Sequence, residues 1–325
     1  AFVACNNDDE VTIDSNSSDG KPLTAGTADV TKYVALGDSY AAGYSDNALF
    51  SLGQEGSYAN IIAKQFALAG GGEFKTPLMA DNVGGLLLGG NVIAGPRLYF
   101  NGSAPVAVTG KPSTEVTTKL TGPFNNLSVP GAKSYHLLAA GYGNVAGVAA
   151  GLANPYFARF ATSAATTVVA DAVAQNPTFF SLWIGGNDVL GYATSGGTGK
   201  DQKGNLNPAT YAASDITDPS VFASVYSNIV NTMTAKGAKG IVANLPYVTA
   251  LPFFTTVPYN PATLSATQAS DLNNAYDAYN RGLIAAKNAG LITETERLAR
   301  TINFTTGANG VIMVDEYLTT VNVPG

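Results

Sequence analysis

The stretch Lys32-Tyr33-Val34-Ala35-Leu36-Gly37-Asp38-Ser39-Tyr40 decides how this 325-residue chain is interpreted. Its apolar run over residues 33–36 predicts a buried β-strand. Gly37-Asp38-Ser39 then ends the strand with residues that favour a turn. Ligands of an open parallel sheet bind at the carboxyl ends of its strands, so a serine on this turn could project its hydroxyl into a cleft as a nucleophile. The alternative is that Asp38 and Ser39 only turn the chain or cap a helix.

The composition is that of a folded protein with a sizeable core. Hydrophobic residues make up 46% of the chain and charged residues only 12%, which excludes global disorder. The net charge of −6 argues against nucleic acid as a partner. No apolar run reaches the roughly 18 to 20 residues that span a bilayer. One cysteine and one histidine cannot build a zinc site or a disulfide, and we expect no metal or cofactor.

The N-terminal segment, residues 1–30, is predicted to be a flexible tether. Its polar and acidic run over residues 6–20 has too little apolar surface to fold. Val3-Ala4-Cys5 ahead of this run resembles the lipobox of a bacterial lipoprotein, with Phe2 where leucine is usual. The resemblance implies a signal peptide and a lipidated Cys5 that anchors the protein to the bacterial cell envelope, at the outer membrane. The alternative is a cysteine that is there by chance.

From residue 31 onward, predicted strands alternate with predicted helices. Strands are expected at 33–37, 178–184, 239–245 and 310–314, and helices at 57–69, 133–140, 162–175, 219–236, 267–289 and 294–301. This alternation predicts one α/β domain over residues 31–325, a three-layer α/β/α sandwich with a mostly parallel sheet. Residues from about 74 to 123 are rich in Gly, Pro, Thr and Val, which favours an insertion of hairpins and loops at the functional edge of the sheet.

Three blocks of sequence each end a strand-like segment in a turn. They are Leu36-Gly37-Asp38-Ser39-Tyr40, Asn126-Leu127-Ser128-Val129-Pro130-Gly131-Ala132 and Trp183-Ile184-Gly185-Gly186-Asn187-Asp188. In this order the blocks resemble those of the GDSL-type, or SGNH, serine hydrolases, with Tyr40 where leucine is commoner in that family. The resemblance covers residues 33–314 apart from the insertion. It implies an esterase or lipase-like acyl hydrolase whose nucleophile is Ser39.

The same resemblance implies an oxyanion hole. The backbone N–H groups of Ser39 and Gly131 and the side-chain amide of Asn187 would stabilise the negative charge of a tetrahedral intermediate. Gly131 has no side chain to keep substrate from its N–H, and Asn187 offers two N–H donors without a charge. One such donor is typically worth about 3 to 4 kcal/mol. The alternative for Asn187-Asp188 is a polar turn whose side chain bonds its own backbone.

The general base of that family, a histidine in a late Asp-x-x-His block, has no counterpart in this sequence. His136, the one histidine, follows Gly131 in a predicted helix, and we expect it to be a polar residue packed beside the cleft. We therefore expect little or no turnover by this chain, which would be either a fragment missing its C-terminal elements or a pseudo-enzyme that lost its base.

The resemblance leaves the substrate open among small-molecule, lipid and carbohydrate esters, and the protein is expected to be a monomer. A different class of function also stays open. It is a catalytically inactive surface lipoprotein that binds an acyl or carbohydrate ligand on the same scaffold.

Overall fold

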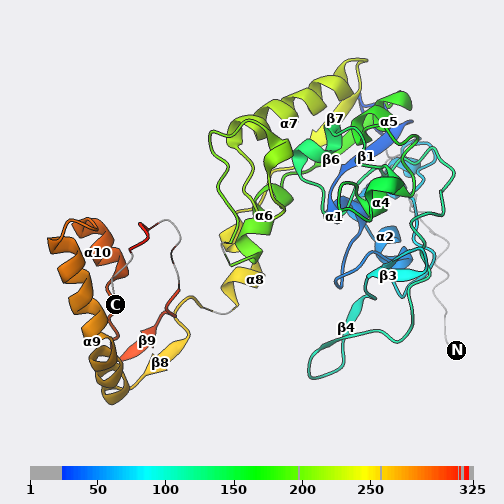
Figure 1. Cartoon of the computed structure of the whole chain (residues 1–325). Coiled ribbons are helices and arrows are strands. Elements are labelled where there is room, and N and C mark those ends of the chain that lie inside the picture. The colour runs from blue at the N-terminus through cyan, green and yellow to red at the C-terminus, as the bar shows by residue number, and fades with distance from the viewer. Residues whose placement is uncertain (1–23, 197, 257, 314, 316–317, 322–325) are drawn as a thin grey trace, which may run out of the picture. The chain divides into compact units, whose positions relative to one another are not determined.

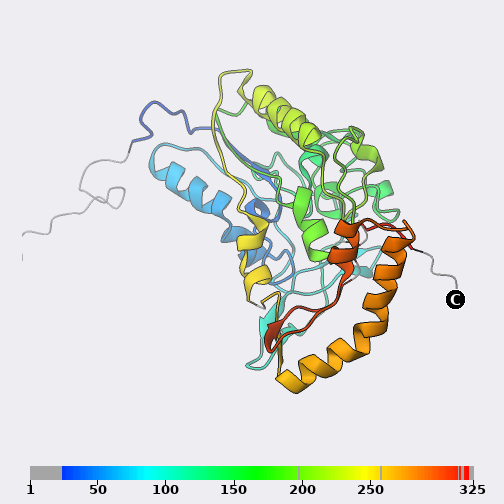
Figure 2. The same cartoon turned by 90° about the vertical axis from the view of Figure 1, so that its left-hand side faces the viewer.

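The computed structural model describes residues 24–196, 198–256, 258–313, 315 and 318–321. Cys5 and the rest of the predicted tether up to residue 23 lie outside these residues. The chain divides into two compact units, Ala1–Pro246 and Tyr247–Gly325 (Figures 1 and 2). The sequence predicted one domain over residues 31–325, whereas the structure has a boundary after Pro246.

The first unit is built on a three-stranded parallel sheet. Its strands β1 (Tyr33–Gly37), β6 (Phe179–Trp183) and β7 (Lys239–Val242) lie side by side in that order (Figure 1). The register places Gly37 opposite Trp183, so β1 and β6 end at the same level. The mixed α/β class and the strands expected at 33–37, 178–184 and 239–245 are confirmed, with somewhat shorter bounds for the last two.

A further segment runs alongside β1 on the side away from β6. The Ala35 N–H donates to the Asn125 carbonyl at 2.9 Å, and the Leu127 N–H donates back to the Ala35 carbonyl at 2.9 Å. One step further, the Val129 N–H donates to the Gly37 carbonyl at 3.0 Å. This alternation is the hydrogen-bond pattern of a parallel ladder, and Ala35 and Asn126 form a parallel bridge. Gly131, which follows this segment, therefore lies at the edge of the sheet where β1 ends.

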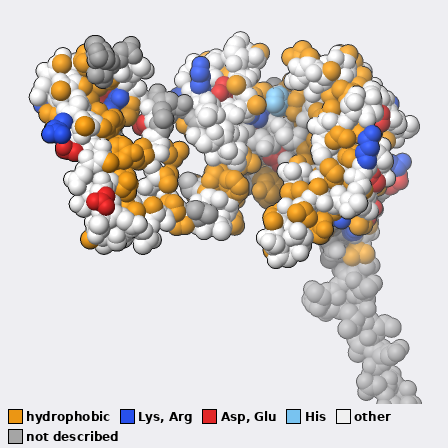
Figure 3. All heavy atoms as spheres, turned by 60° about the horizontal axis from the view of Figure 1, so that its bottom comes forward, with side chains coloured by type: hydrophobic (Ala, Val, Ile, Leu, Met, Phe, Trp, Pro, Cys, Tyr) orange, Lys and Arg blue, Asp and Glu red, His pale blue; other side chains and the backbone are white. Residues whose placement is uncertain are grey.

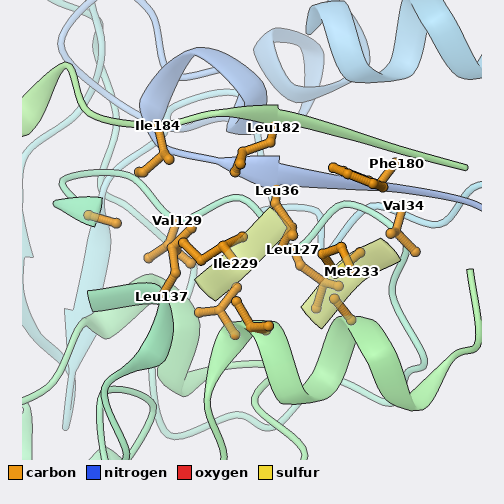
Figure 4. Close-up of a cluster of buried hydrophobic side chains, with 14 of the residues drawn as sticks. Val34, Leu36, Leu127, Val129, Leu137, Phe180, Leu182, Ile184, Ile229 and Met233 are labelled. Carbon is orange, nitrogen blue, oxygen red and sulfur yellow. The ribbon is translucent and has the colours of Figure 1, made fainter. Parts of the chain in front are cut away.

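Helices cover both faces of this sheet. Successive strand side chains point to opposite faces, so Val34 and Leu36 pack against α5 (Val168–Ala174) and α7 (Pro219–Thr234). Tyr33 and Ala35 pack on the other face against α3 (Tyr58–Leu68). Figure 4 shows the larger cluster, with residues of α7 facing those of the strands. β1 and β6 are buried on both faces and are mostly apolar along their length. β7, at the edge of the sheet, is exposed.

Members of that larger cluster come from the sheet, from the segment alongside β1 and from the helices that cover this face of the sheet. The residues labelled in Figure 4 are Val34, Leu36, Leu127, Val129, Leu137, Phe180, Leu182, Ile184, Ile229 and Met233.

The helices of the first unit begin and end as local sequence dictates. Ser57 caps α3 by accepting the Asn60 N–H, and Asp218 caps α7 directly before a proline at the first helical position. The helix predicted at 162–175 is shorter than expected, because the Asp171 carboxylate bonds the backbone and side chain of Thr162 and holds that segment out of the helix. The helix predicted at 133–140 is a short 3₁₀ helix, η1 (Ser134–Leu138).

Shorter elements complete this unit. They are α1 (Ser39–Ala42), α2 (Ser51–Glu55), η2 (Val145–Gly147), α4 (Pro155–Ala158), α6 (Asn187–Thr194) and η3 (Pro208–Thr210). The stretch from 74 to 123 holds two antiparallel hairpins, as predicted. One pairs β2 (Leu86–Leu88) with β3 (Asn91–Ala94), and the other pairs β4 (Leu98–Phe100) with β5 (Pro105–Ala107).

The second unit contains a long helix and a two-stranded antiparallel sheet, whose strands are separated in the sequence by two helices. Its elements are η4 (Val248–Ala250), α8 (Pro252–Thr255), β8 (Ala262–Leu264), α9 (Ala266–Asn288), α10 (Glu294–Arg300) and β9 (Gly307–Asn309) (Figure 2). Capping boxes start α9, where Ser265 pairs with Gln268, and α10, where Thr293 pairs with Glu296.

The strand predicted at 310–314 is wrong. Residues 310–313 form no strand, and the strand of this region, β9, ends at Asn309 and pairs antiparallel with β8. An apolar run alone does not make a strand, because β-propensity depends on a partner edge and on packing. Here the Asn309 side chain bonds the backbone N–H and carbonyl of Thr305, which folds the chain back on itself at β9.

Gly37 is where β1, β6 and α1 approach one another most closely. A Cβ on Gly37 would lie 2.6 Å from the Trp183 carbonyl oxygen and 2.9 Å from the Ala41 Cβ. We predict that Gly37→Ala lowers the free energy of unfolding by about 1 to 3 kcal/mol through overpacking, as measured by urea denaturation. Gly95→Ala is the matched control, since its Cβ would meet nothing within 4 Å, and should change stability by no more than about 0.5 kcal/mol. Similar losses in both variants would contradict the close approach at Gly37.

Candidate functional site

The three sequence blocks contact one another in pairs. The first and second blocks are joined by the hydrogen bond from the Val129 N–H to the Gly37 carbonyl. The second and third are joined by the Asn187 amide, whose Nδ2 donates to the Ala132 carbonyl at 2.9 Å. The third and first lie close as well, because a Cβ on Gly186 would be 3.5 Å from the Asp38 Oδ2. The segments that carry the three predicted site residues therefore meet at the carboxyl edge of the sheet.

Ser39 is the first residue of α1 and is half-buried. The preceding Asp38 caps this helix, with its Oδ1 accepting the Tyr40 N–H at 3.2 Å. The capping role that the sequence left open is thus filled by Asp38. Neither the hydroxyl nor the backbone N–H of Ser39 donates a hydrogen bond to another residue in the described part of the chain.

Gly131 is exposed and has a φ of +78°. A residue with a side chain is strained in this left-handed region, so the backbone conformation alone accounts for a glycine at this position. A Cβ added there would meet nothing within 4 Å, which means that the space above Gly131 is open. Among the residues that the structure describes, none accepts a hydrogen bond from the Gly131 N–H.

Asn187 opens α6 and is half-buried. Its side chain bonds Ala132, a distant part of the chain, rather than its own backbone. The alternative of a local polar turn therefore does not describe this side chain. An amide nitrogen carries two hydrogens, so the bond to Ala132 leaves one of them for a ligand.

Asp188 links the third block to η1, the 3₁₀ helix that follows the second block. Its two carboxylate oxygens accept the Ser134 N–H at 2.8 Å and the Ser134 hydroxyl at 2.7 Å. Sequence reasoning missed this role of Ser134. The signal was a serine at the start of a predicted helix, but its partner lies more than fifty positions away in the sequence.

Two buried carboxyl groups lie behind these turns. Burial, together with the neighbouring Asp188 carboxylate, raises the pKa of Asp38 to about 6. Burial also raises the pKa of Asp188, which the bonds from Ser134 oppose. Burial is the main cause for both groups, because a region of low dielectric disfavours the charged form. The Lys133 ammonium donates to the Asp215 carbonyl at 2.8 Å. Its positive charge opposes the rise in the pKa of Asp188.

His136 is packed beside this site. Its Nδ1 accepts the Lys133 N–H at 3.0 Å, and its ring stacks on Tyr142 with the ring centres 4.5 Å apart. Burial, with the Lys133 charge, lowers the pKa of His136 to about 4. The imidazole is therefore neutral at pH 7, and its one hydrogen is on Nε2 because Nδ1 is the acceptor. A ring in this state has no free lone pair with which to take a proton from a serine.

Aromatic rings next to Ser39 were also missed by sequence reasoning. The Tyr40 ring stacks on Trp183, with the centres 5.2 Å apart and the planes 13° apart. Tyr58 of α3 packs on the same indole at 5.5 Å. Both Tyr40 and Trp183 belong to the blocks quoted above, but nothing in their spacing shows that their rings touch.

A wide cavity of about 780 Å³ lies elsewhere in the first unit. Lys32 and Val34 line it at the amino end of β1, together with Phe124 and Phe160, so it is not the predicted site.

Within the described ranges, no group of three or more His, Cys, Asp or Glu residues could hold a metal ion. No helix in this part of the chain has the length and apolar character needed to cross a membrane. Charged side chains are sparse on the face drawn in Figure 3.

Comparisons with known proteins give no relative: no family model, no curated protein and no solved structure matches the chain.

The state of His136 gives a pH dependence of stability. Its folded pKa of about 4 lies below its ordinary value of 6.5, so the unfolded chain binds this proton more readily. The stability gained from a neutral His136 in the folded chain is fully present above pH 6.5 and is lost as the pH falls through 4. At 1.36 kcal/mol per pKa unit, about 2 to 3 kcal/mol should be lost between about pH 7.5 and about pH 4.5. His136→Asn keeps an acceptor for the Lys133 N–H. We predict that its free energy of unfolding falls over this pH range by about 2 to 3 kcal/mol less than that of the wild type.

Urea unfolding of both proteins at the two pH values measures this difference. The raised pKa of Asp38 has the opposite sign, since it lowers stability as the pH rises from about 4 to about 6. It is present in both proteins and cancels when their pH dependences are subtracted. Equal losses in the wild type and in His136→Asn would show that the imidazole is not held neutral.

Proposed function

We propose that this protein is a serine ester hydrolase of the GDSL or SGNH type. The observation that carries the proposal is the pairwise contact of the three blocks at one edge of the sheet. It is supported by the backbone N–H groups of Ser39 and Gly131, neither of which donates to any described residue. The Asn187 amide bonds the residue next to Gly131. These are the donors that a developing oxyanion requires.

In the proposed reaction, the Ser39 Oγ adds to the carbonyl carbon of an ester and its proton passes to a base. The charge on the carbonyl oxygen is held by the two backbone N–H groups and by Asn187. The bond to the alcohol then breaks, the alcohol leaves with a proton, and water releases the acid from the acylated Ser39. Fixed donors favour this path because they need not reorganise as the charge forms.

The base is the part of this scheme that His136 does not supply, since its Nδ1 accepts the Lys133 N–H and its pKa is near 4. We therefore propose that acyl transfer by the 325-residue chain alone is slow. The same observation favours the second candidate, a protein that holds an acyl or carbohydrate ligand on this scaffold without turning it over.

We also propose a substrate class, a partner set and a location for this protein. The substrate would be a small-molecule, lipid or carbohydrate ester, and no cofactor or nucleic acid would take part. The protein would be a monomer anchored through a lipidated Cys5 in the bacterial cell envelope, at the outer membrane. Cys5 lies outside the described residues.

A base supplied in solution should rescue a site that has a nucleophile and an oxyanion hole. We predict that imidazole accelerates p-nitrophenyl acetate hydrolysis by the wild-type chain beyond its own background. Ser39→Ala should remove the whole protein-dependent rate. Asn187→Ala should lower it about 100- to 1000-fold, the usual cost of one oxyanion donor. Release of p-nitrophenol, followed over a series of imidazole concentrations, measures each rate.

Ser103→Ala is the matched control, because Ser103 lies in an exposed part of the insertion. It should behave as the wild type. If the wild type and Ser39→Ala give the same rate at every imidazole concentration, the hydrolase proposal fails and the ligand-binding candidate replaces it.

A further inference from the structure

The ring of Tyr40 is exposed and yet held in place. Tyr40 is 52% exposed, although its ring stacks nearly parallel on Trp183 at 5.2 Å. Trp183 is fixed in turn, since it ends β6 opposite Gly37 and packs on Tyr58 of α3. The backbone of Tyr40 is bonded to the Asp38 carboxylate. An exposed aromatic ring in a single orientation has little conformational entropy left to lose when a ligand binds.

Tyr40 directly follows Ser39. Their Cα atoms are about 3.8 Å apart, and successive residues of a helix point about 100° apart around its axis, at 3.6 residues per turn. The two side chains therefore leave the helix from neighbouring positions in different directions, so the ring does not lie over the Ser39 hydroxyl. A group that stacks on the ring would belong to the part of an ester a few bonds away from its carbonyl carbon.

The chemistry of this surface favours a neutral planar ring. Tyr40, Trp183 and Tyr58 form a cluster of uncharged aromatic groups, in which Tyr40 stacks on Trp183 and Tyr58 packs on it at a tilt. A further ring at an offset-stacked distance is worth about 0.5 to 1.5 kcal/mol beyond its buried area. A saturated ring of the same size buries similar area but cannot stack face to face.

We propose that Tyr40 and Trp183 form a subsite that binds an aromatic ring of the substrate, in its acyl or its alcohol part, next to Ser39. The substrate class is then an aromatic ester. This inference rests on the proposed function for its biological meaning, but ring binding can be measured without turnover.

Trp183 is the only tryptophan of the chain, so its fluorescence reports on this subsite alone. The experiment titrates the Ser39→Ala protein with benzyl alcohol, with cyclohexylmethanol and with methyl β-D-glucopyranoside. We predict a saturable change of tryptophan emission with benzyl alcohol. Binding of cyclohexylmethanol should be about 2- to 12-fold weaker, the factor that corresponds to the stacking energy. The glucoside should bind more weakly than benzyl alcohol.

Variants made in the same Ser39→Ala background separate the subsite from general packing. Tyr40→Leu should abolish the preference for benzyl alcohol over cyclohexylmethanol, and Tyr40→Phe, which keeps the ring, should retain it. Tyr99→Leu is the matched control, because Tyr99 is 49% exposed in the hairpin of β4 and should not contribute. Circular dichroism checks that each variant is folded.

Outcomes for the subsite and for the hydrolase are distinguishable. An aromatic preference that survives Tyr40→Leu, equal binding of the two alcohols, or tighter binding of the glucoside overturns the subsite, whatever the hydrolysis assay shows. Aromatic binding that depends on Tyr40, together with no Ser39-dependent hydrolysis in imidazole, supports the subsite and removes the hydrolase.

Discussion

The parallel pairing of β1 with β6 is the constraint on which the rest of the first unit depends. Its register sets Gly37 opposite Trp183, so two turns from distant parts of the sequence start at the same level. The segment ending at Val129 adds the third turn by pairing with β1 on the other side. Because parallel strands all end at one edge, the sheet brings together polar residues that have no local reason to meet.

Side-chain bonds between the turns then hold the edge in place. The Asn187 amide reaches the backbone of the second block, and the Asp188 carboxylate binds both polar groups of Ser134. Burying a carboxylate is costly unless hydrogen bonds compensate, and Asp188 accepts two. Asp38 is buried as well, and the raised pKa values of both acids express the remaining cost. The edge therefore combines exposed backbone donors at Gly131 with buried acids behind them.

Much of this arrangement follows from local sequence. Residues 33–37 form a strand, as predicted from an apolar run with Tyr, Val and Leu that ends in Gly-Asp-Ser. The starts of α3 and α7 follow from Ser57 and from Asp218 before a proline. Residues 310–314 and 162–175 were misjudged for one reason. A strand needs a partner edge. A segment can be held out of a helix by a carboxylate such as Asp171, and neither partner is visible in a local window.

The sequence by itself determined the strands of the parallel sheet, the starts of α3 and α7, and which turns carry a serine, a glycine and an asparagine. These follow from the conformational preferences of each residue and of its near neighbours. Only the tertiary structure decided that Tyr40 stacks on Trp183, that His136 is neutral with Nδ1 occupied, and that a boundary follows Pro246. Ring contacts depend on strand register and pKa values on burial, and both are properties of the packed chain.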